Sequence, residues 1–263
     1  MDADRPVGEL LREWRHRRKL SQLDLAIAAD VSSRHISFVE TGRTTPSRTM
    51  VLHLAEHLNV PLRERNRLLI AAGHAPQFHR RDWSDPKLRP AREAVQRVLH
   101  LHEPFPALAV DRRWNLVQAN DCVHVFFDEV DPALLQPPIN MMRLGLHPRG
   151  FAHRLRNLDQ IRAILLPRLA RQVTASGDPE LTTLYEELLT YTAPITDTDP
   201  AEIVLPIRLV HRGVELTLFS TVTTFGTAHD ITLSEIAVEA YFPGNAETTN
   251  YLHELAGSTG PGR

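Results

Sequence analysis

The first part of the chain carries apolar residues at helical spacing, in short runs separated by turn-forming residues. Val7, Leu10, Leu11 and Trp14 recur three and four positions apart, which predicts an amphipathic helix extending to Lys19. Four similar runs follow before residue 73. Five short helices within residues 1–75 predict a compact all-α domain.

The second and third of these helices have clear boundary signals. Ser21 and Ser32 each stand where a side-chain oxygen can accept from the free amides of a first helical turn. Gly42 stands where a left-handed residue can end the third helix. We expect an apolar inner side made of Leu25, Ala26, Ala29, Ile36 and Val39, and an outer side made of Ser33, Arg34, Ser37 and Phe38.

After residue 73 the helical pattern stops. Residues 76–92 mix proline with charged residues and show no sustained apolar period, which predicts a linker. Residues 93–263 then form a second domain. It begins with a helix over about 91–103, two strands around the Asp111-Arg112-Arg113 turn, and a helix from Asp121. Residues 140–191 read as several helical pieces, one of them interrupted at Pro167.

Beyond residue 200 the pattern changes to short β-rich runs. IVLPIRLV and VELTLFSTVTTF flank His211-Arg212-Gly213, which predicts a hairpin turn. The third run, ITLSEIAVEAYF, places Ile236, Val238, Ala240 and Phe242 on one face and Glu235 and Glu239 on the other. We therefore expect an α+β domain with an antiparallel sheet covered by helices.

Composition narrows the picture only slightly. The chain has 263 residues, no run of 18 apolar residues and no apolar signal region at its start, so we expect a soluble, cytoplasmic protein of two domains. The single cysteine, Cys122, excludes an intrachain disulfide framework and is expected to be a small core residue. Residues 1–89 carry 16 basic against 11 acidic residues, whereas the remainder carries 14 against 21. A basic module joined to an acidic one is typical of a DNA-binding domain carried by a domain that does not bind DNA.

The motif SQ..LA..A.VS...IS.VE.GR..PS resembles the Xre and lambda-repressor type of helix-turn-helix. One position departs from that family, which usually has glycine in the turn where this chain has Asp30. Aspartate tolerates left-handed dihedral angles better than most residues, so we expect the turn to be kept.

A second resemblance covers most of the chain, from Gly8 to about Leu255. SRHISFVETGR, PLRERNRLLIAAGHAP, NMMRLGLHPRG and FGTAHDITLSEIAVEAYFP are similar to regulators with an MmyB-like ligand-binding domain. The resemblance implies an Xre-type helix-turn-helix joined to a PAS-like sensory domain, hence a ligand-responsive transcription factor without a cofactor. Its ligand would be small and apolar, with fatty-acid-like molecules as one suggestion. A tryptophan that relatives tend to carry near Asn157 is absent from NLDQIRA.

Docking of such a motif on double-stranded DNA assigns roles to particular residues. Arg34 is expected to read a guanine, with Phe38 available to a thymine methyl group. His35 can contact a phosphate or cap the helix, and the sequence leaves both open. The candidate DNA-binding residues are Gln22, Ser32, Ser33, Arg34, His35, Ser37, Phe38, Arg43 and Thr44, of which Gln22, Arg43 and Thr44 are expected to hold phosphates.

A single small domain reads few base pairs, so we expect a homodimer on a palindromic operator, with the dimer interface and the ligand cavity in the C-terminal domain. The sequence does not reveal the ligand-binding residues.

The alternative is an enzyme or protein-interaction module built on the C-terminal domain, with the helix-turn-helix as an accessory. His53, Glu56 and His57 match a zinc-peptidase pattern, H-x-x-E-H, but lie inside a helix that the repressor-like motif already explains. The sequence contains no G-x-S-x-G, Walker or dinucleotide motif. We therefore expect no catalytic residues, no metal site and no membrane association.

Overall fold

The computed structural model describes residues 5–191 and 204–259. The chain forms two compact units. The first comprises residues 1–82 together with residues 226–234, and the second comprises residues 83–225 together with residues 235–263. Each unit has its own core of buried apolar side chains, so each is described separately.

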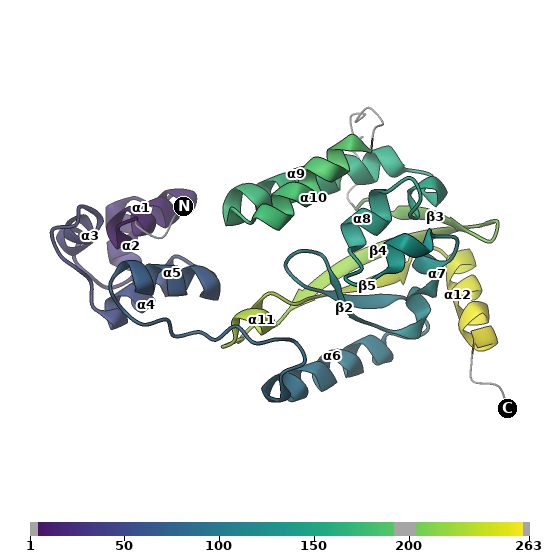
Figure 1. The fold of residues 1–263 in the computed structure, drawn as a ribbon, viewed down its shortest axis with the longest axis horizontal. Helices are drawn as coiled ribbons and strands as arrows, with labels where there is room; N and C mark the ends of the chain where they lie inside the picture. The colour runs from purple at the N-terminus through teal and green to yellow at the C-terminus, as the bar shows by residue number, and fades with distance from the viewer. Residues whose placement is uncertain (1–4, 192–203, 260–263) are drawn as a thin grey trace. The chain divides into compact units, whose positions relative to one another are not determined.

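The first unit contains the predicted helices and one apolar core. Its helices follow one another closely along the chain (Figure 1): α1 Val7–Arg17, α2 Gln22–Ala28, α3 Ser33–Glu40, α4 Arg48–His57 and α5 Leu62–Ala71. The five inner residues expected of the second and third helices are all buried, each at 3% exposure or less. The all-α prediction for this part of the chain is confirmed.

Serine side chains begin three of these helices. Ser21 Oγ accepts a hydrogen bond from the amide of Asp24 at 3.0 Å, and Ser32 Oγ accepts one from the amide of His35 at 3.1 Å. Ser47 does the same at the start of α4. Each bond satisfies an amide that has no partner within its own helix, so the caps predicted from the sequence fix where α2 and α3 begin.

The turn between α2 and α3 has the left-handed residue that the motif requires. Asp30 has a φ of +49°, and Gly42, which follows α3, has a φ of +72°. The amide of Val31 bonds to the carbonyl oxygen of Ala26 at 3.0 Å, which closes the turn. Aspartate therefore takes the place of the usual glycine without loss of the turn.

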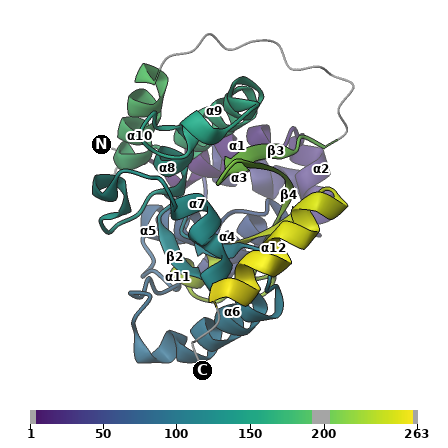
Figure 2. The same ribbon diagram turned by 90° about the vertical axis from the view of Figure 1, so that its right-hand side faces the viewer.

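The second unit is an α+β domain, as predicted. Figure 2 shows its long C-terminal helix lying along the sheet. Its elements are η1 Pro86–Leu88, α6 Arg89–Leu101, β1 Ala107–Val110, β2 Leu116–Ala119, η2 Asp121–Val123, α7 His124–Phe127, η3 Pro132–Leu135, α8 Met141–Leu146, η4 Ala152–Arg154, α9 Leu158–Ser176, α10 Pro179–Thr190, β3 Ile207–His211, β4 Val214–Thr224, β5 Ala237–Pro243 and α12 Ala246–Thr259.

The five strands form one antiparallel sheet in the order β2-β1-β5-β4-β3. Arg212 and Gly213 join β3 to β4 with φ angles of +48° and +83°, which is the two-residue hairpin expected from the sequence. Leu108 and Val110 of β1 belong to the core on one face, whereas Ala107 and Ala109 pack on the other face against α6. The antiparallel sheet with helices packed on it is the α+β arrangement that the sequence predicted.

Helix α9 runs from Leu158 to Ser176 through Pro167, so the predicted interruption at Pro167 is wrong. Proline removes one backbone hydrogen bond, and the apolar side chains Leu166 and Leu169 beside it are at most 2% exposed. Packing of these side chains compensates for the missing bond, because the stability of most protein helices comes from tertiary contacts.

The third β-rich run also differs from its prediction. Its first residues form a short helix, α11 Ile231–Ser234, and only Ala237–Pro243 is a strand. Ile236 and Val238 are buried as expected, but Phe242 is 43% exposed.

Across the described residues, no helix is both long and apolar enough to cross a membrane.

Candidate functional site

Helix α3 presents one face to the core and the other to solvent. Ile36, Val39 and Glu40 are buried, whereas Ser33 and Arg34 are exposed. Ser37 and Phe38 are half-buried. The serine cap and the buried face together fix the rotation of α3, so that the outer positions predicted from the sequence share one side of the helix.

A buried ion pair holds α3 from behind. Arg15 of α1 donates to both carboxylate oxygens of Glu40, at 2.7 and 2.8 Å, and also to the carbonyl oxygen of Leu20 at 2.8 Å. Gln22 donates to Glu40 at 2.8 Å. Burial acts to raise the pKa of Glu40, but the hydrogen bonds from Arg15 and Gln22 outweigh it and lower that pKa.

The sequence did not reveal this pair. Arg15 is a charged residue outside the apolar pattern of the first helix, yet its side chain is only 7% exposed. Glu40 lies 25 residues further along the chain, and no local spacing rule links residues so far apart. The buried pair fixes Gln22 as well, because Gln22 completes the hydrogen bonds of the carboxylate.

Three outer side chains form a cluster at the exposed side of α3. The guanidinium carbon of Arg34 lies 5.1 Å from the ring centroid of Phe38, and that of Arg43 lies 5.7 Å from the same centroid. Cations at this distance are attracted to an aromatic ring. The amides of Arg43 and Thr44 both bond to the carbonyl oxygen of Phe38, at 2.8 and 3.2 Å, which holds the segment after α3 close to the helix.

His35 is the one predicted residue of α3 with an unsatisfied buried group. Its side chain is half-buried, and its Nε2 atom has no hydrogen-bond partner in the structure. Its backbone amide, rather than its ring, takes part in the cap of α3. The structure therefore shows no capping role for the imidazole.

The histidines of the H-x-x-E-H match have other contacts. Nε2 of His53 lies 2.6 Å from the carbonyl oxygen of Ala29, and its ring packs edge-on against His57 at 4.7 Å between centroids. His57 and Glu56 are exposed. Within residues 5–191 and 204–259, no three His, Cys, Asp or Glu side chains are grouped so as to hold a metal ion.

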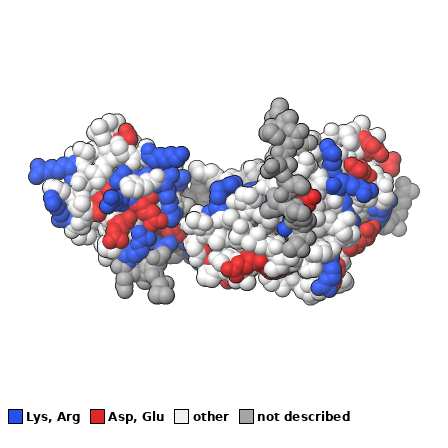
Figure 3. Space-filling model, turned by 90° about the horizontal axis from the view of Figure 1, so that it is seen from above, with Lys and Arg blue, Asp and Glu red and all other residues white. Residues whose placement is uncertain are grey.

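Charged side chains are mixed on the first unit. In Figure 3, basic residues are interleaved with acidic ones over the face of this unit that the view shows. This distribution agrees with the modest excess of 16 basic over 11 acidic residues in residues 1–89. Position on α3 for Arg34, and directly after α3 for Arg43, therefore distinguishes these two arginines more than a continuous basic surface does.

The second unit contains a largely apolar pocket of about 180 Å³ between the sheet and helices α8 and α9. An apolar cavity of about 150 Å³ is large enough to hold benzene. The apolar lining residues are Trp114, Met141, Met142, Gly145, Leu146, Phe151, Leu155, Ile161, Ile164, Leu165, Leu205 and Ile207, and the polar ones are Arg168, Ser220, Glu239 and Tyr241.

Glu239 is a carboxyl group in these apolar surroundings. It takes part in hydrogen bonds with the side chains of Ser220 and Tyr241. Burial raises the pKa of Glu239 and outweighs the lowering effect of those hydrogen bonds and of the Arg168 charge. Burial also raises the pKa of Tyr241 well above its ordinary value. The strand alternation grouped Glu239 with Glu235, but it gave no sign that this face borders a pocket.

Trp114 forms a fixed wall of the same pocket. Its backbone φ is +68°, a conformation that costs energy for a bulky side chain. Its indole nitrogen donates to Gln172 at 3.0 Å, and the guanidinium carbon of Arg168 lies 4.7 Å from its ring centroid. Because α9 holds the ring at both points, the position of Trp114 depends on α9.

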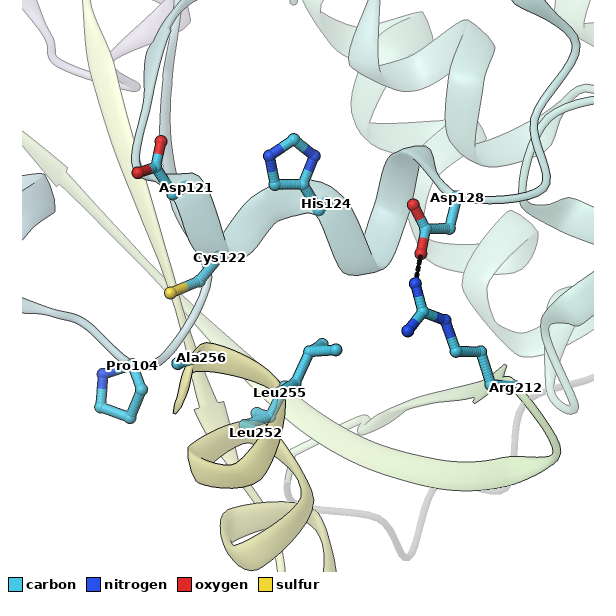
Figure 4. A pocket seen from close by; sticks show the side chains of 9 residues that line it. All are labelled: Pro104, Asp121, Cys122, His124, Asp128, Arg212, Leu252, Leu255 and Ala256. Carbon is cyan, nitrogen blue, oxygen red and sulfur yellow. Dashed lines mark hydrogen bonds and ion pairs between the residues drawn. The ribbon is translucent and has the colours of Figure 1, made fainter. Parts of the chain in front are cut away.

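A second pocket, of about 240 Å³, lies between the η2 and α7 segment and helix α12 (Figure 4). Cys122 lies in its wall and is half-buried, not in the core as predicted. Burial and then the charges of Glu103 and Asp121 raise the pKa of Cys122 to about 11, so the thiol is protonated at neutral pH. A protonated thiol is a weak nucleophile.

Two charged residues that line this second pocket, Asp128 and Arg212, are paired with one another. Asp128 accepts from Arg212 at 2.9 Å and lies 3.0 Å from Nε2 of His211. The other ring nitrogen of His211 is 2.7 Å from the hydroxyl oxygen of Tyr251, and His211 is fully buried. His211 is thus held inside the fold, out of reach of a substrate.

Comparison with known proteins agrees with this geometry. A profile of the MmyB-like transcription regulator ligand binding domain matches residues 91–255, and a profile of a helix-turn-helix domain matches residues 6–68. A helix-turn-helix unit joined to such a domain defines a DNA-binding transcriptional regulator with a ligand-sensing domain. The chain belongs to the family with the MmyB-like transcription regulator ligand binding domain.

Two individual proteins are similar to parts of the chain. The uncharacterized HTH-type transcriptional regulator RghRB of Bacillus subtilis (strain 168) is 36% identical over 99 residues, which is 37% of this chain. The match spans 65% of that relative's length. The solved PAS domain of Bordetella pertussis BvgS aligns with 63% of this chain and 98% of its own at 14% identity, with a TM-score of 0.24.

Proposed function

We propose that α3 enters a major groove of double-stranded DNA and that Arg34 reads a base there. The supporting observation is that Arg34 is exposed, lies against Phe38, and stands on a helix whose opposite face is held by the Arg15–Glu40 pair. Paired with both acceptors of a guanine, an arginine contributes about 1–3 kcal/mol of discrimination. Phe38 contacts a thymine methyl group, and Ser32, Ser33, His35 and Ser37 complete the surface.

Three further residues would set the register of the domain through the phosphates. Arg43 and Thr44 are exposed just beyond α3, and Gln22 begins α2. Their backbone or side chains are tied to Phe38 or Glu40, so a phosphate contact made here would position α3 as well. Phosphate contacts add affinity for any sequence, whereas base contacts distinguish sequences.

The protein would act as a homodimer on a palindromic operator, with the second unit as the dimer interface. One domain of this size contacts too few base pairs to select a single genomic site, and two-fold symmetry doubles the number that is read. Light scattering on the full chain, alone and with operator DNA, tests this. A complex with one chain per operator would contradict it.

The apolar pocket in the second unit would bind the effector, a small apolar molecule with one polar group. The walls are aliphatic and aromatic, and Arg168, Ser220 and Glu239 supply the few polar groups that fix orientation in such sites. Mass spectrometry of the compound that co-purifies with the chain identifies the effector. Arg168→Leu should reduce its recovery, whereas Arg171→Leu, an exposed arginine on the same helix, should not.

One experiment tests the DNA-binding proposal directly. Selection of genomic fragments by the purified chain should enrich a common sequence with inverted repeats. The same selection with Arg34→Ala should enrich a more degenerate sequence. Equal enrichment of unrelated fragments by both proteins would contradict base reading by α3.

A further inference from the structure

The connection between β4 and β5 belongs to a different unit from the two strands that it joins. Strand β4 ends at Thr224 and β5 begins at Ala237, and both lie in the second unit. Residues 226–234 between them are part of the first unit, together with the DNA-binding helices. We refer to residues 226–234, which include α11, as the docking segment.

The docking segment contacts residues 79–81 through backbone and side chains. The amide of Ile231 bonds to the carbonyl oxygen of His79 at 2.8 Å, and the hydroxyl of Thr232 donates to the carbonyl oxygen of Arg81 at 2.5 Å. Arg81 forms an ion pair with Asp230 at 2.5 Å. Asp230 and Ile231 are 6% and 4% exposed, and α11 packs on α5. The docking segment thus contributes buried residues to these contacts, whereas the Arg81 side chain is 22% exposed.

Residues 77 and 78, which precede the residues that contact the docking segment, are bound to α5. The side-chain oxygen of Asn66 accepts from the amides of Gln77 and Phe78, at 2.9 and 3.0 Å, and its nitrogen donates to the carbonyl oxygen of Phe78 at 2.7 Å. Arg48 of α4 donates to Gln77 at 3.0 Å. The segment that leaves α5 is therefore fixed to the helices by Asn66 and to the docking segment by Arg81.

The strands on either side of the docking segment form part of the apolar pocket. Ser220 of β4 pairs with Tyr241 of β5, and both line that pocket with Glu239. Glu239 lies five residues beyond Ser234, which corresponds to roughly 17 Å along a strand at about 3.3 Å per residue. Glu235, next to the docking segment, pairs with Arg112 at 3.5 Å. A paired two-stranded ribbon joins the pocket to the docking segment.

We infer that the docking segment transmits the state of the pocket to the DNA-binding helices. A molecule bound in the pocket displaces Ser220, Glu239 or Tyr241. The β4–β5 ribbon carries that displacement along its length to the docking segment. Asp230 and Thr232 then pass it to residues 79–81, and thus to α5. A ligand shifts DNA affinity only through interactions that differ between two states, and here the differing interactions are those of the docking segment. The inference rests on the proposed function for the existence of an occupied pocket.

The test combines a filled pocket with a weakened docking segment in the full chain. Leu165→Trp, with Ile164→Trp as a second variant, fills the pocket in place of a ligand. Arg81→Gln removes the ion pair with Asp230, and Arg80→Gln, at the exposed neighbouring arginine, is the matched control. Affinity for a selected operator fragment is measured for each single and double variant.

We expect pocket filling to change operator affinity by about 5-fold or more in the wild-type and Arg80→Gln backgrounds, the lower end of typical allosteric coupling. In the Arg81→Gln background the change should fall below about 2-fold. An equal change in both backgrounds would overturn the inference and leave the proposed function intact. If pocket filling has no effect in any background, ligand control of DNA binding is overturned as well.

The rate of amide hydrogen exchange gives an independent test of the same contacts. Arg81→Gln and Thr232→Val should each speed exchange at the amide of Ile231, which bonds to His79, relative to Arg80→Gln. Unchanged exchange in both variants would show that these side chains do not hold the docking segment, and would overturn the inference without reference to any ligand.

Discussion

Two arginines share the ring of Phe38, yet their positions predict different effects on DNA binding. Arg34 is on α3 itself, while Arg43 is on the segment that follows it. A residue within the groove meets base edges, and a residue beyond the helix meets the phosphate backbone. The same chemical group should therefore contribute specificity at one position and general affinity at the other.

Substitution of the two arginines by alanine should separate these contributions. Arg34→Ala should lower affinity for the operator by about 1–3 kcal/mol while leaving affinity for unrelated DNA nearly unchanged. Arg43→Ala should weaken binding to both DNAs to a similar extent. It should also reduce the slope of log K against log salt concentration by about one unit. Fluorescence anisotropy with both DNAs over a salt series measures this. Equal losses on both DNAs for Arg34→Ala would contradict its base-reading role.

The Arg15–Glu40 pair should control the stability of the first unit. Both side chains are at most 7% exposed, and removal of one partner of a buried pair typically costs about 3–5 kcal/mol. Glu40→Leu should therefore lower the free energy of unfolding, measured with urea, by several kcal/mol. Glu13→Gln, which breaks more exposed pairs with Arg5 and Arg17, should cost about 1 kcal/mol or less. Equal costs would show that burial does not strengthen the pair.

The same pair predicts how stability depends on pH. The pKa of Glu40 is lower in the folded chain than its unfolded value, which is about 4.3 for a glutamate. The stability that ionised Glu40 contributes is therefore complete at pH values above the unfolded pKa. It is lost as the pH falls through the pKa of the folded chain. Between neutral pH and about pH 3, wild-type should lose more unfolding free energy than Glu40→Gln. An equal loss of unfolding free energy in wild-type and Glu40→Gln over this pH range would contradict the prediction.

At the scale of elements, the close approach of α1 to α3 depends on one glycine. A Cβ atom at Gly8 would lie 2.3 Å from the carbonyl oxygen of Val39 and 2.8 Å from that of Glu40. Both atoms are backbone, so they can move only if α3 moves. The lack of a side chain at position 8 therefore sets the distance between the two helices.

Gly8→Ala should displace α3 and cost about 1–3 kcal/mol of stability, the range for an overpacked core. Operator affinity should fall in the surviving folded protein, because the outer residues of α3 move with the helix. Gly257→Ala in α12 is the matched control, since a Cβ there meets no atom within 4 Å. It should be neutral or stabilising by up to about 1 kcal/mol. Thermal unfolding and DNA titration check both variants.

The sequence predicted elements whose signals are local. Ser21, Ser32 and Gly42 mark the ends of helices within a few residues, and Arg212-Gly213 marks a hairpin in the same way. Helix α9 was less predictable, because its passage through Pro167 depends on tertiary packing that local propensity does not include.

The site was only partly predictable for a related reason. The outer face of α3 follows from helical spacing alone, but Arg15 and Glu40 meet across 25 residues and appear simply as charged residues in the sequence. Glu239 is a polar residue of an alternating strand, and only the helices packed opposite it make its surroundings apolar. Pocket residues are defined by tertiary structure, so the sequence predicted a ligand without predicting where it binds.

At the scale of the whole molecule, the chain passes between a DNA-binding unit and a ligand-sensing unit three times, once after residue 82 and once on either side of residues 226–234. A single flexible connection would let the two units act independently. Three covalent crossings instead give three routes by which a change in one unit can reach the other.

Thermodynamic linkage requires the two binding events to influence each other equally. If the co-purifying effector changes operator affinity by a given factor, saturating operator DNA must change effector affinity by the same factor. Titration calorimetry with the effector, with and without operator DNA, measures this. Unequal factors would indicate a further linked equilibrium, such as dimerisation, that differs between the two experiments.

The placement of Trp114 has an optical consequence. The chain has three tryptophans; Trp14 packs against the core of the first unit and Trp83 packs beside α6, whereas Trp114 lines the apolar pocket. Replacement of Trp14 and Trp83 by phenylalanine would leave one emitting indole, fixed by Gln172 and Arg168 at the pocket wall. Its emission would then shift when the pocket fills, so the protein carries a built-in fluorophore that reports occupancy without any label.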